Sequence, residues 1–115
     1  MSKRIRETST GDSIEGFVRA QKSFSEEVFG PGKRTLGICR HIASELEEIQ
    51  AEPESLEEWC DVIILALDGA WRAGYTPREI RDALLAKQRK NMARQWPAAM
   101  SEDEPVFHRR GRRES

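Results

Sequence analysis

The order of apolar and polar positions along the chain predicts four α-helices and no β-strand. Asp12 or Ser13 can cap a first helix, in which apolar and small polar residues recur at three- and four-residue steps. The segment Phe29–Gly32 should end this helix, because Pro31 lacks an N–H and the glycines accept unusual backbone angles. The face that the first helix turns inward consists of Ile14, Phe17, Val18, Gln21, Phe24, Ser25 and Val28.

The second and third helices are predicted on either side of residues 51–55, where Pro53 should break any continuous helix. The second helix, residues 34–50, has one apolar stripe, and the third, residues 56–72, is apolar on almost every face. A helix with so little polar surface is typically buried nearly all round. The stripe comprises Ile38, Ile42, Leu46 and Ile49, and the third helix carries Trp59, Val62, Ile63, Leu65 and Ala66.

A fourth helix has the clearest start signal in the chain. Thr76, Pro77 and Glu79 supply a cap residue, a first-position proline and a third-position glutamate in the order of a capping box. The helix should continue until Trp96 and Pro97 stop it. Its inward stripe changes from apolar to polar and cationic along its length, from Ile80, Ala83 and Leu84 to Lys87, Asn91 and Arg94.

With 115 residues, the chain has the size of one domain. We predict a helical domain at residues 13–97, between a loose polar segment at residues 1–12 and a charged tail at residues 98–115 that we expect to be mobile. The formal net charge of −1 gives no electrostatic reason for stable binding to nucleic acid or to an anionic membrane. The tail arginines are better explained as solvated.

Neither membrane insertion nor export is predicted. The longest apolar run, Val62–Leu67, is far shorter than the ~20 residues of a membrane-spanning helix. The polar start of the chain also lacks an apolar leader. Cys39 and Cys60 lie within helical apolar patterns without metal-type spacing, so we interpret them as reduced thiols of the core. Reduced cysteines favour an intracellular, cytoplasmic protein.

Two acidic pairs form the candidate site. Glu45 and Glu48 belong to the second helix, and Glu58 and Asp61, at the same spacing, belong to the third. The first pair falls in or along the apolar stripe, whereas Glu47 points to the far side, and the second pair lies on the apolar surface of its helix. Burying an ionised carboxylate without a partner is costly, so such groups normally have a cation beside them. We therefore expect a metal ion among the four carboxylates.

The ligand type narrows the choice of metal. Oxygen donors alone favour Mg²⁺ or Mn²⁺ over zinc. A di-iron carboxylate bundle would need a Glu-x-x-His motif on each of two helices, and neither acidic pair includes one. Solvated helix faces explain most isolated glutamate pairs, but two pairs that both point inward favour a site.

Three neighbours of the acidic pairs have structural as well as functional interpretations. His41, one turn before Glu45, is better explained as a hydrogen-bond partner of a carboxylate than as a metal ligand. Asp68 and Arg72 share the face of the second acidic pair and could support the site. A structural ion pair explains them equally well.

Two further groups suit parts of a nucleotide. Lys87, Asn91 and Arg94 present either a row of donors for phosphate oxygens or an exposed helix end. At the end of the first helix, aromatic rings could stack on a base, a contact worth about 1–3 kcal/mol, and the adjacent glycines allow close backbone approach. The candidate base-binding residues are Gln21, Phe24, Ser25 and Phe29.

The order of these motifs resembles that of the MazG-like all-α nucleoside triphosphate pyrophosphatases. The chain carries E-x-x-E, a connection, E-x-x-D and then Lys-x-x-x-Asn-x-x-Arg. The wider run of SEEVFGPGKRTLGICRHIASELEEI, LEEWCDVIILALDGAWRAGYTPREI and KQRKNMARQWP is similar to the phage and bacterial dATP/dGTP diphosphohydrolases of that superfamily, the MazZ-like group. The resemblance covers residues 21–97. The connection between the acidic pairs is shorter than in many MazG proteins.

The resemblance implies a four-helix bundle completed by dimerisation, as a homodimer or homotetramer, and hydrolysis of dGTP or dATP to the monophosphate and pyrophosphate. Water would attack the α-phosphorus while two or more Mg²⁺ or Mn²⁺ ions, held by the four carboxylates, clamp the phosphates. Glu45 or Glu48 would take the proton of the water. A hydrophobic fraction of 37% and an all-round apolar third helix also favour at least a dimer.

Two alternatives remain open from the sequence. One is a pyrophosphatase of the same fold that acts on pyrimidine or modified nucleotides, and the other is a non-catalytic helical interaction protein. Stacking favours the larger purine surface, in agreement with the resemblance. Phe24 and Phe29 could instead belong to the core, with the base pocket supplied by a partner subunit.

Overall fold

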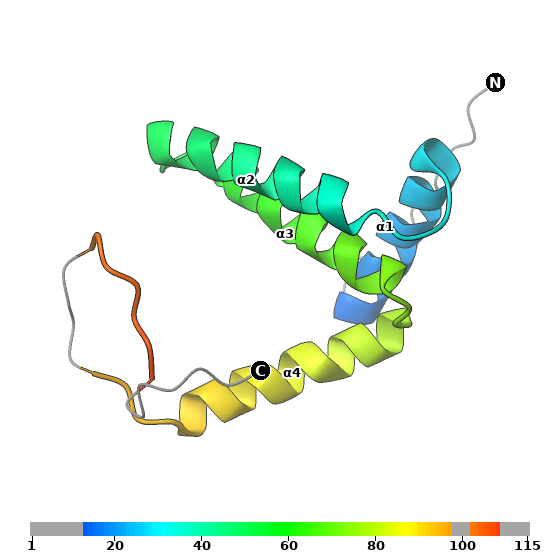
Figure 1. Ribbon diagram of the computed structural model, residues 1–115. Coiled ribbons are helices and arrows are strands. Elements are labelled where there is room, and N and C mark those ends of the chain that lie inside the picture. The colour runs from blue at the N-terminus through cyan, green and yellow to red at the C-terminus, as the bar shows by residue number, and fades with distance from the viewer. Residues whose placement is uncertain (1–12, 98–101, 109–115) are drawn as a thin grey trace. The chain divides into compact units, whose positions relative to one another are not determined.

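The computed structural model describes residues 13–97 and 102–108 and contains, within these ranges, four α-helices and no strand (Figure 1). The helices are α1 (Ile14–Phe29), α2 (Thr35–Ala51), α3 (Leu56–Arg72) and α4 (Pro77–Ala93). The predicted all-α class is confirmed, and α3 has the predicted bounds. The segment at residues 1–12 and much of the charged tail, residues 98–101 and 109–115, lie outside the described residues.

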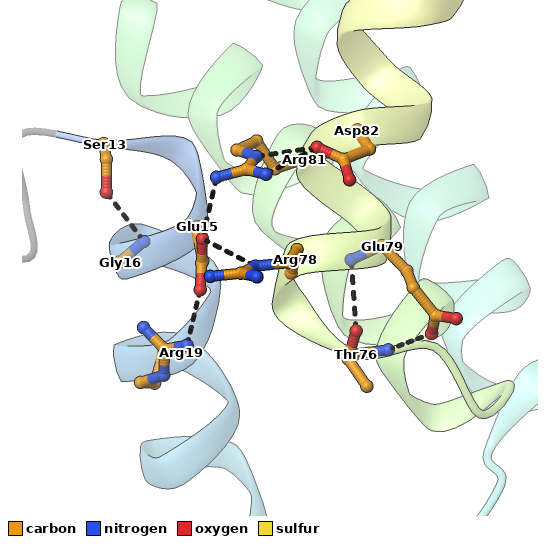
Figure 2. A network of polar contacts seen from close by, with 9 residues as sticks. All are labelled: Ser13, Glu15, Gly16, Arg19, Thr76, Arg78, Glu79, Arg81 and Asp82. Atoms are coloured by element: carbon orange, nitrogen blue, oxygen red, sulfur yellow. Dashed lines mark hydrogen bonds and ion pairs between the residues drawn. The ribbon is translucent and has the colours of Figure 1, made fainter.

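Side chains cap two of the helices as the sequence predicts. At α1, the Oγ of Ser13 accepts a hydrogen bond from the backbone N–H of Gly16 at 3.0 Å. At α4, the Thr76 N–H donates to Glu79 Oε1 at 2.9 Å and the Glu79 N–H donates to Thr76 Oγ1 at 3.1 Å (Figure 2). This reciprocal pair satisfies two backbone donors that a helix start leaves free, which fixes the first residue of α4.

The chain divides into two compact units, and the boundary in the sequence falls within α4, between Asp82 and Ala83. In the first unit, α2 runs beside α3 and α1 packs against α3 (Figure 1). The second unit includes the rest of α4 and residues 102–108. In this unit the Trp96 Nε1–H donates to the Asn91 carbonyl at 2.7 Å, and the Trp96 ring meets the buried His108 ring edge to face at 6.0 Å.

The core of the first unit is small. Val18 of α1, Trp71 of α3 and Ile80 of α4 form one buried cluster, with the partly buried Leu67 and Ala70 packed against it. Val18 has no exposed surface. The first turn of α4 is therefore anchored to α1 and α3 by apolar contact, and Ile38 and Ile49 are the buried apolar residues of α2.

An ionic cluster also ties the start of α4 to α1 (Figure 2). Glu15 accepts hydrogen bonds from Arg19 Nη2 at 2.7 Å and Arg81 Nη1 at 2.9 Å, and Arg78 Nε lies 3.8 Å from the same carboxylate. The hydrogen bond from Arg19 and the charges of the three arginines lower the pKa of Glu15. Arg81 also contacts Asp82 at 2.7 Å. The contact of Glu15 with Arg78 and Arg81 was not expected from the sequence, because more than 60 residues separate Glu15 from these arginines.

The expectation that α3 is buried nearly all round is wrong for the single chain. Trp59 and Ile63 are 48% and 57% exposed, because α1 and α2 cover only part of the surface of α3. The inward faces predicted for α1 and α2 are likewise only partly buried, and Phe17 and Leu46 are exposed. Phe24, Val28, Phe29, Leu56 and Ile64 are further exposed apolar residues of these three helices.

The interpretation of both cysteines as core thiols is also wrong. Cys39 and Cys60 are free, as expected, but both are exposed. They occupy the sides of α2 and α3 that no other helix of the described chain covers. Within residues 13–97 and 102–108, no helix combines the length and the apolarity that crossing a bilayer requires.

Candidate active site

A tight connection places the two acidic pairs opposite each other. The Ser55 N–H donates to the Glu52 carbonyl at 3.1 Å, and the Trp59 indole N–H reaches back to the Pro53 carbonyl at 2.9 Å. Pro53 therefore breaks the helix, and the indole of α3 holds the loop. The last turns of α2 then face the first turns of α3 (Figure 1).

Three of the four predicted carboxylates come together between α2 and α3. Glu45, Glu48 and Glu58 each offer one oxygen, and these oxygens lie within 4.8 Å of one another. Three anionic oxygens at this separation repel one another strongly unless a proton or a cation lies between them.

Glu45 is largely buried at this site. Its side chain is 12% exposed, and its Oε2 lies 3.3 Å from His41 Nε2. Its Oε1 is buried and accepts no hydrogen bond from the described part of the chain. A buried carboxylate oxygen without a donor needs a partner. Because the clustered ligands are the carboxylates of Glu45, Glu48 and Glu58, a hard divalent cation fits that position.

The carboxylates also change the acidity of Glu58. A hydrogen bond with Glu48, followed by the loss of surrounding water and by the negative charges of Glu48, Glu45 and Asp61, raises the pKa of Glu58 to about 7. The cluster therefore retains a proton near neutral pH when no cation is bound. Asp61 is half-buried and lies outside the group of three oxygens, yet its charge is one of those that act on Glu58.

Asp68 and Arg72 lie away from this cluster, toward the other end of α3. Asp68 is roughly ten residues, or about 15 Å, along the helix from Glu58. Its Oδ2 accepts from Arg72 Nε at 3.1 Å and its Oδ1 from Gln21 Nε2 at 3.2 Å. The pair therefore contacts α1 rather than the acidic cluster.

The candidate base-binding residues lie between the middle and the last residue of α1. Phe24 and Phe29 are exposed, and their rings meet edge to face with centroids 6.4 Å apart. Arg34, which the sequence analysis did not single out, lies with its Cζ 5.5 Å from the centroid of the Phe29 ring. Ser25 is buried, and its Oγ accepts a hydrogen bond from Arg72 Nη2 at 2.8 Å. The Oε1 of Gln21 is buried without a hydrogen-bond partner among the described residues.

Lys87, Asn91 and Arg94 belong to the second unit. Lys87 is exposed, and Arg94 Nη1 donates to Asn91 Oδ1 at 2.7 Å. Asn91 and Arg94 therefore form one polar group at the end of α4, where Arg94 directly follows the last helical residue. Their role as phosphate donors stays a prediction.

Comparison with known proteins identifies the class of enzyme. The model of the dATP/dGTP pyrophosphohydrolase family matches residues 17–110, most of the chain. The protein belongs to this family, and the resemblance described above is confirmed. It is thus a hydrolase that releases pyrophosphate from dATP and dGTP. This family membership argues against the alternative of a non-catalytic interaction protein. No curated protein and no solved structure gave a match.

Proposed function

We propose that this pyrophosphohydrolase works with two or more Mg²⁺ or Mn²⁺ ions held by Glu45, Glu48, Glu58 and Asp61. The observation that carries the proposal is the buried Oε1 of Glu45, which accepts no hydrogen bond within the described chain although Glu45 belongs to a cluster of three carboxylates. The all-oxygen donor set suits these two cations. Both acidic pairs come from adjacent helices, so the ligands are held on rigid elements.

The carboxylates also provide the base for the reaction. Ions bound at the cluster would neutralise charge on the phosphates and activate water. Glu45 or Glu48 takes a proton from the water that attacks the α-phosphorus, and the bond from this phosphorus to the bridging oxygen breaks, which releases pyrophosphate. The contact of His41 with Glu45 Oε2 favours one orientation of this carboxylate.

Lys87, Asn91 and Arg94 are proposed to bind the outer phosphates. Ammonium, amide and guanidinium groups all donate hydrogen bonds, and the two cations also offset the charge that builds on the departing pyrophosphate. We propose that residues 13–97, which include these three residues and the four carboxylates, form the catalytic domain. We further propose that the enzyme acts in the cytoplasm as a homodimer or homotetramer.

Purine selection is proposed to depend on Gln21, Phe24, Ser25 and Phe29. Two exposed rings offer stacking surfaces. The free Oε1 of Gln21 is an acceptor, and guanine and adenine both carry an amino group that could donate to it. This combination would recognise both purines of the family's substrates.

A panel of nucleotides tests the proposal. Pyrophosphate release should be fast with dGTP and dATP in Mg²⁺ or Mn²⁺, slow with pyrimidine deoxynucleotides, and absent when the divalent ions are chelated. Activity that survives chelation would contradict the metal assignment. Faster turnover of a pyrimidine or modified nucleotide would contradict the base assignment while leaving the metal assignment intact.

A further inference from the structure

Arg72 is a buried cation that links three segments of the first unit. Its side chain is 1% exposed. The Nε donates to Asp68 Oδ2 at 3.1 Å, and the Nη2 donates to Ser25 Oγ at 2.8 Å and to the Ser25 carbonyl at 3.4 Å. The Nη1 donates to the carbonyls of Gly30 and Gly32, both at 2.9 Å. All three guanidinium nitrogens are therefore engaged, which a lysine ammonium cannot reproduce.

The turn that Arg72 holds is one with wide conformational freedom. Gly30 and Gly32 have φ values of 87° and 95°, a region that residues with side chains rarely adopt. Pro31 between them has no N–H to donate. Hydrogen bonds from the guanidinium to the carbonyls on both sides of Pro31 select one conformation of this turn.

The same network reaches three of the four proposed base-binding residues. Gln21 donates to Asp68, Ser25 accepts from Arg72, and Phe29 directly precedes the Gly30 carbonyl that Arg72 binds. Arg34, on the other side of the turn, lies over the Phe29 ring at 5.5 Å. One buried ion pair at the end of α3 thus connects the polar and the aromatic parts of the base site.

We propose that Arg72 is a positioning residue for base recognition: by fixing the turn at residues 30–32 against α3, it holds Phe29, Ser25 and Gln21 in the arrangement that binds a purine. This inference rests on the base site proposed above. Since Glu58 of the carboxylate cluster is fourteen residues, or about 21 Å, away along α3, loss of Arg72 should weaken binding of the base while leaving the chemistry of the phosphates largely intact.

Two variants loosen the turn from opposite sides. Arg72→Gln removes the guanidinium. Gly32→Ala leaves the buried pair in place and meets no atom within 4 Å, but it forces an alanine into a φ of 95°. If Arg72→Gln fails to fold, Gly32→Ala still tests the turn. Glu15→Gln, which disrupts the ionic cluster between α1 and α4, is the matched control.

The readouts separate the base from the phosphates. Inhibition of dGTP hydrolysis by deoxyguanosine reports on the base site, and inhibition by inorganic pyrophosphate reports on the phosphate site. For both turn variants, the deoxyguanosine inhibition constant and KM for dGTP should rise roughly tenfold. The inhibition constant of pyrophosphate and kcat should stay within about twofold of their original values. Glu15→Gln should change neither inhibition constant.

Each other result has a definite meaning. If kcat and both inhibition constants worsen together in the turn variants, Arg72 has a structural role only and the proposal is wrong. Phe29→Ala, measured in parallel, tests the base site itself. If Phe29→Ala weakens inhibition by deoxyguanosine while the folded turn variants do not, the positioning role of Arg72 is overturned and the proposed base site is supported. If Phe29→Ala has no effect on deoxyguanosine, the base site fails, and the inference with it.

Discussion

Glu45 on α2 and Glu58 on α3 bring carboxylate oxygens within 4.8 Å of each other on either side of the connection that contains Pro53. Glu48 completes this group. Neighbouring carboxylates so close together cannot all ionise freely in the absence of a cation, and the raised pKa of Glu58 expresses this conflict. A bound divalent cation would offset this repulsion between the carboxylates. Several expected properties of the enzyme follow from the replacement of the shared proton by a cation.

The first prediction is that Glu48→Gln or Asp61→Asn abolishes metal-dependent turnover without unfolding the protein. Each change removes one negative ligand from the site while keeping the shape of the side chain. We expect kcat for dGTP to fall roughly 100-fold or more, measured as pyrophosphate release at saturating Mg²⁺. Helix content by circular dichroism should be unchanged.

Glu47→Gln is the matched control for these variants. Glu47 lies on the same helix and carries the same charge, but it is exposed and outside the carboxylate cluster. Its turnover should remain near that of the unmodified enzyme. Near-normal activity of either ligand variant would show that the assignment of the four carboxylates is incorrect.

The second prediction concerns the pH dependence of the metal-free protein. Folding raises the pKa of Glu58 from 4.5 to about 7, so the folded state binds more protons than the unfolded state between these values. Stability from this group is complete below pH 4.5 and is lost as the pH rises through about 7. In the presence of a chelator, the thermal midpoint should decline across this interval.

Two comparisons check that Glu58 is responsible. Glu58→Gln carries no titrating group at this position, so this component of the decline should be absent from its profile. Saturating Mg²⁺ should raise the midpoint most at the alkaline end, where the ionised carboxylates repel one another. A metal-free midpoint that rises over the same interval in the unmodified protein but not in Glu58→Gln would contradict the assigned direction of the pKa shift.

A third prediction is that the protein is at least a dimer at micromolar concentration. Trp59 and Ile63 on α3 and Leu46 on α2 leave a large apolar surface uncovered in the single chain. Light scattering should give at least twice the mass of one chain. Ile63→Lys should shift the population toward monomer, whereas Gln50→Lys, at an exposed polar position, should not. A monomeric unmodified protein would refute this expectation.

Local signals made most of the fold predictable. The capping box of Thr76 and Glu79 and the helix break at Pro53 depend on residues within a few positions of each other, and such patterns are legible in one sequence. The approach of Glu45, Glu48 and Glu58 follows from the same local patterns, since two short helices around a tight connection bring them together, whereas Asp61 lies outside this group.

Relationships between distant residues were not predictable. Arg72 contacts Gly30 and Glu15 contacts Arg81 across long stretches of chain, and helical periodicity does not specify such partners. The exposure of Trp59 and Cys60 was missed because a pattern states that a face is apolar, not which element covers it. Three carboxylates of the candidate metal site are brought together by two helices that adjoin in the chain, whereas the contacts of the candidate base site join α1 to α3.

The last prediction is that Phe24→Ala and Ser25→Ala each raise KM for dGTP far more than they lower kcat. Phe24 presents an exposed ring, and its removal takes away a stacking surface worth about 1–3 kcal/mol, or roughly a tenfold change in KM. Ser25 is buried, so its hydroxyl acts through Arg72 and the turn at residues 30–32. Steady-state kinetics with dGTP, dATP and dCTP should show a lower purine-to-pyrimidine ratio of kcat/KM in both variants. If both folded variants keep the original ratio, the base is read by other residues.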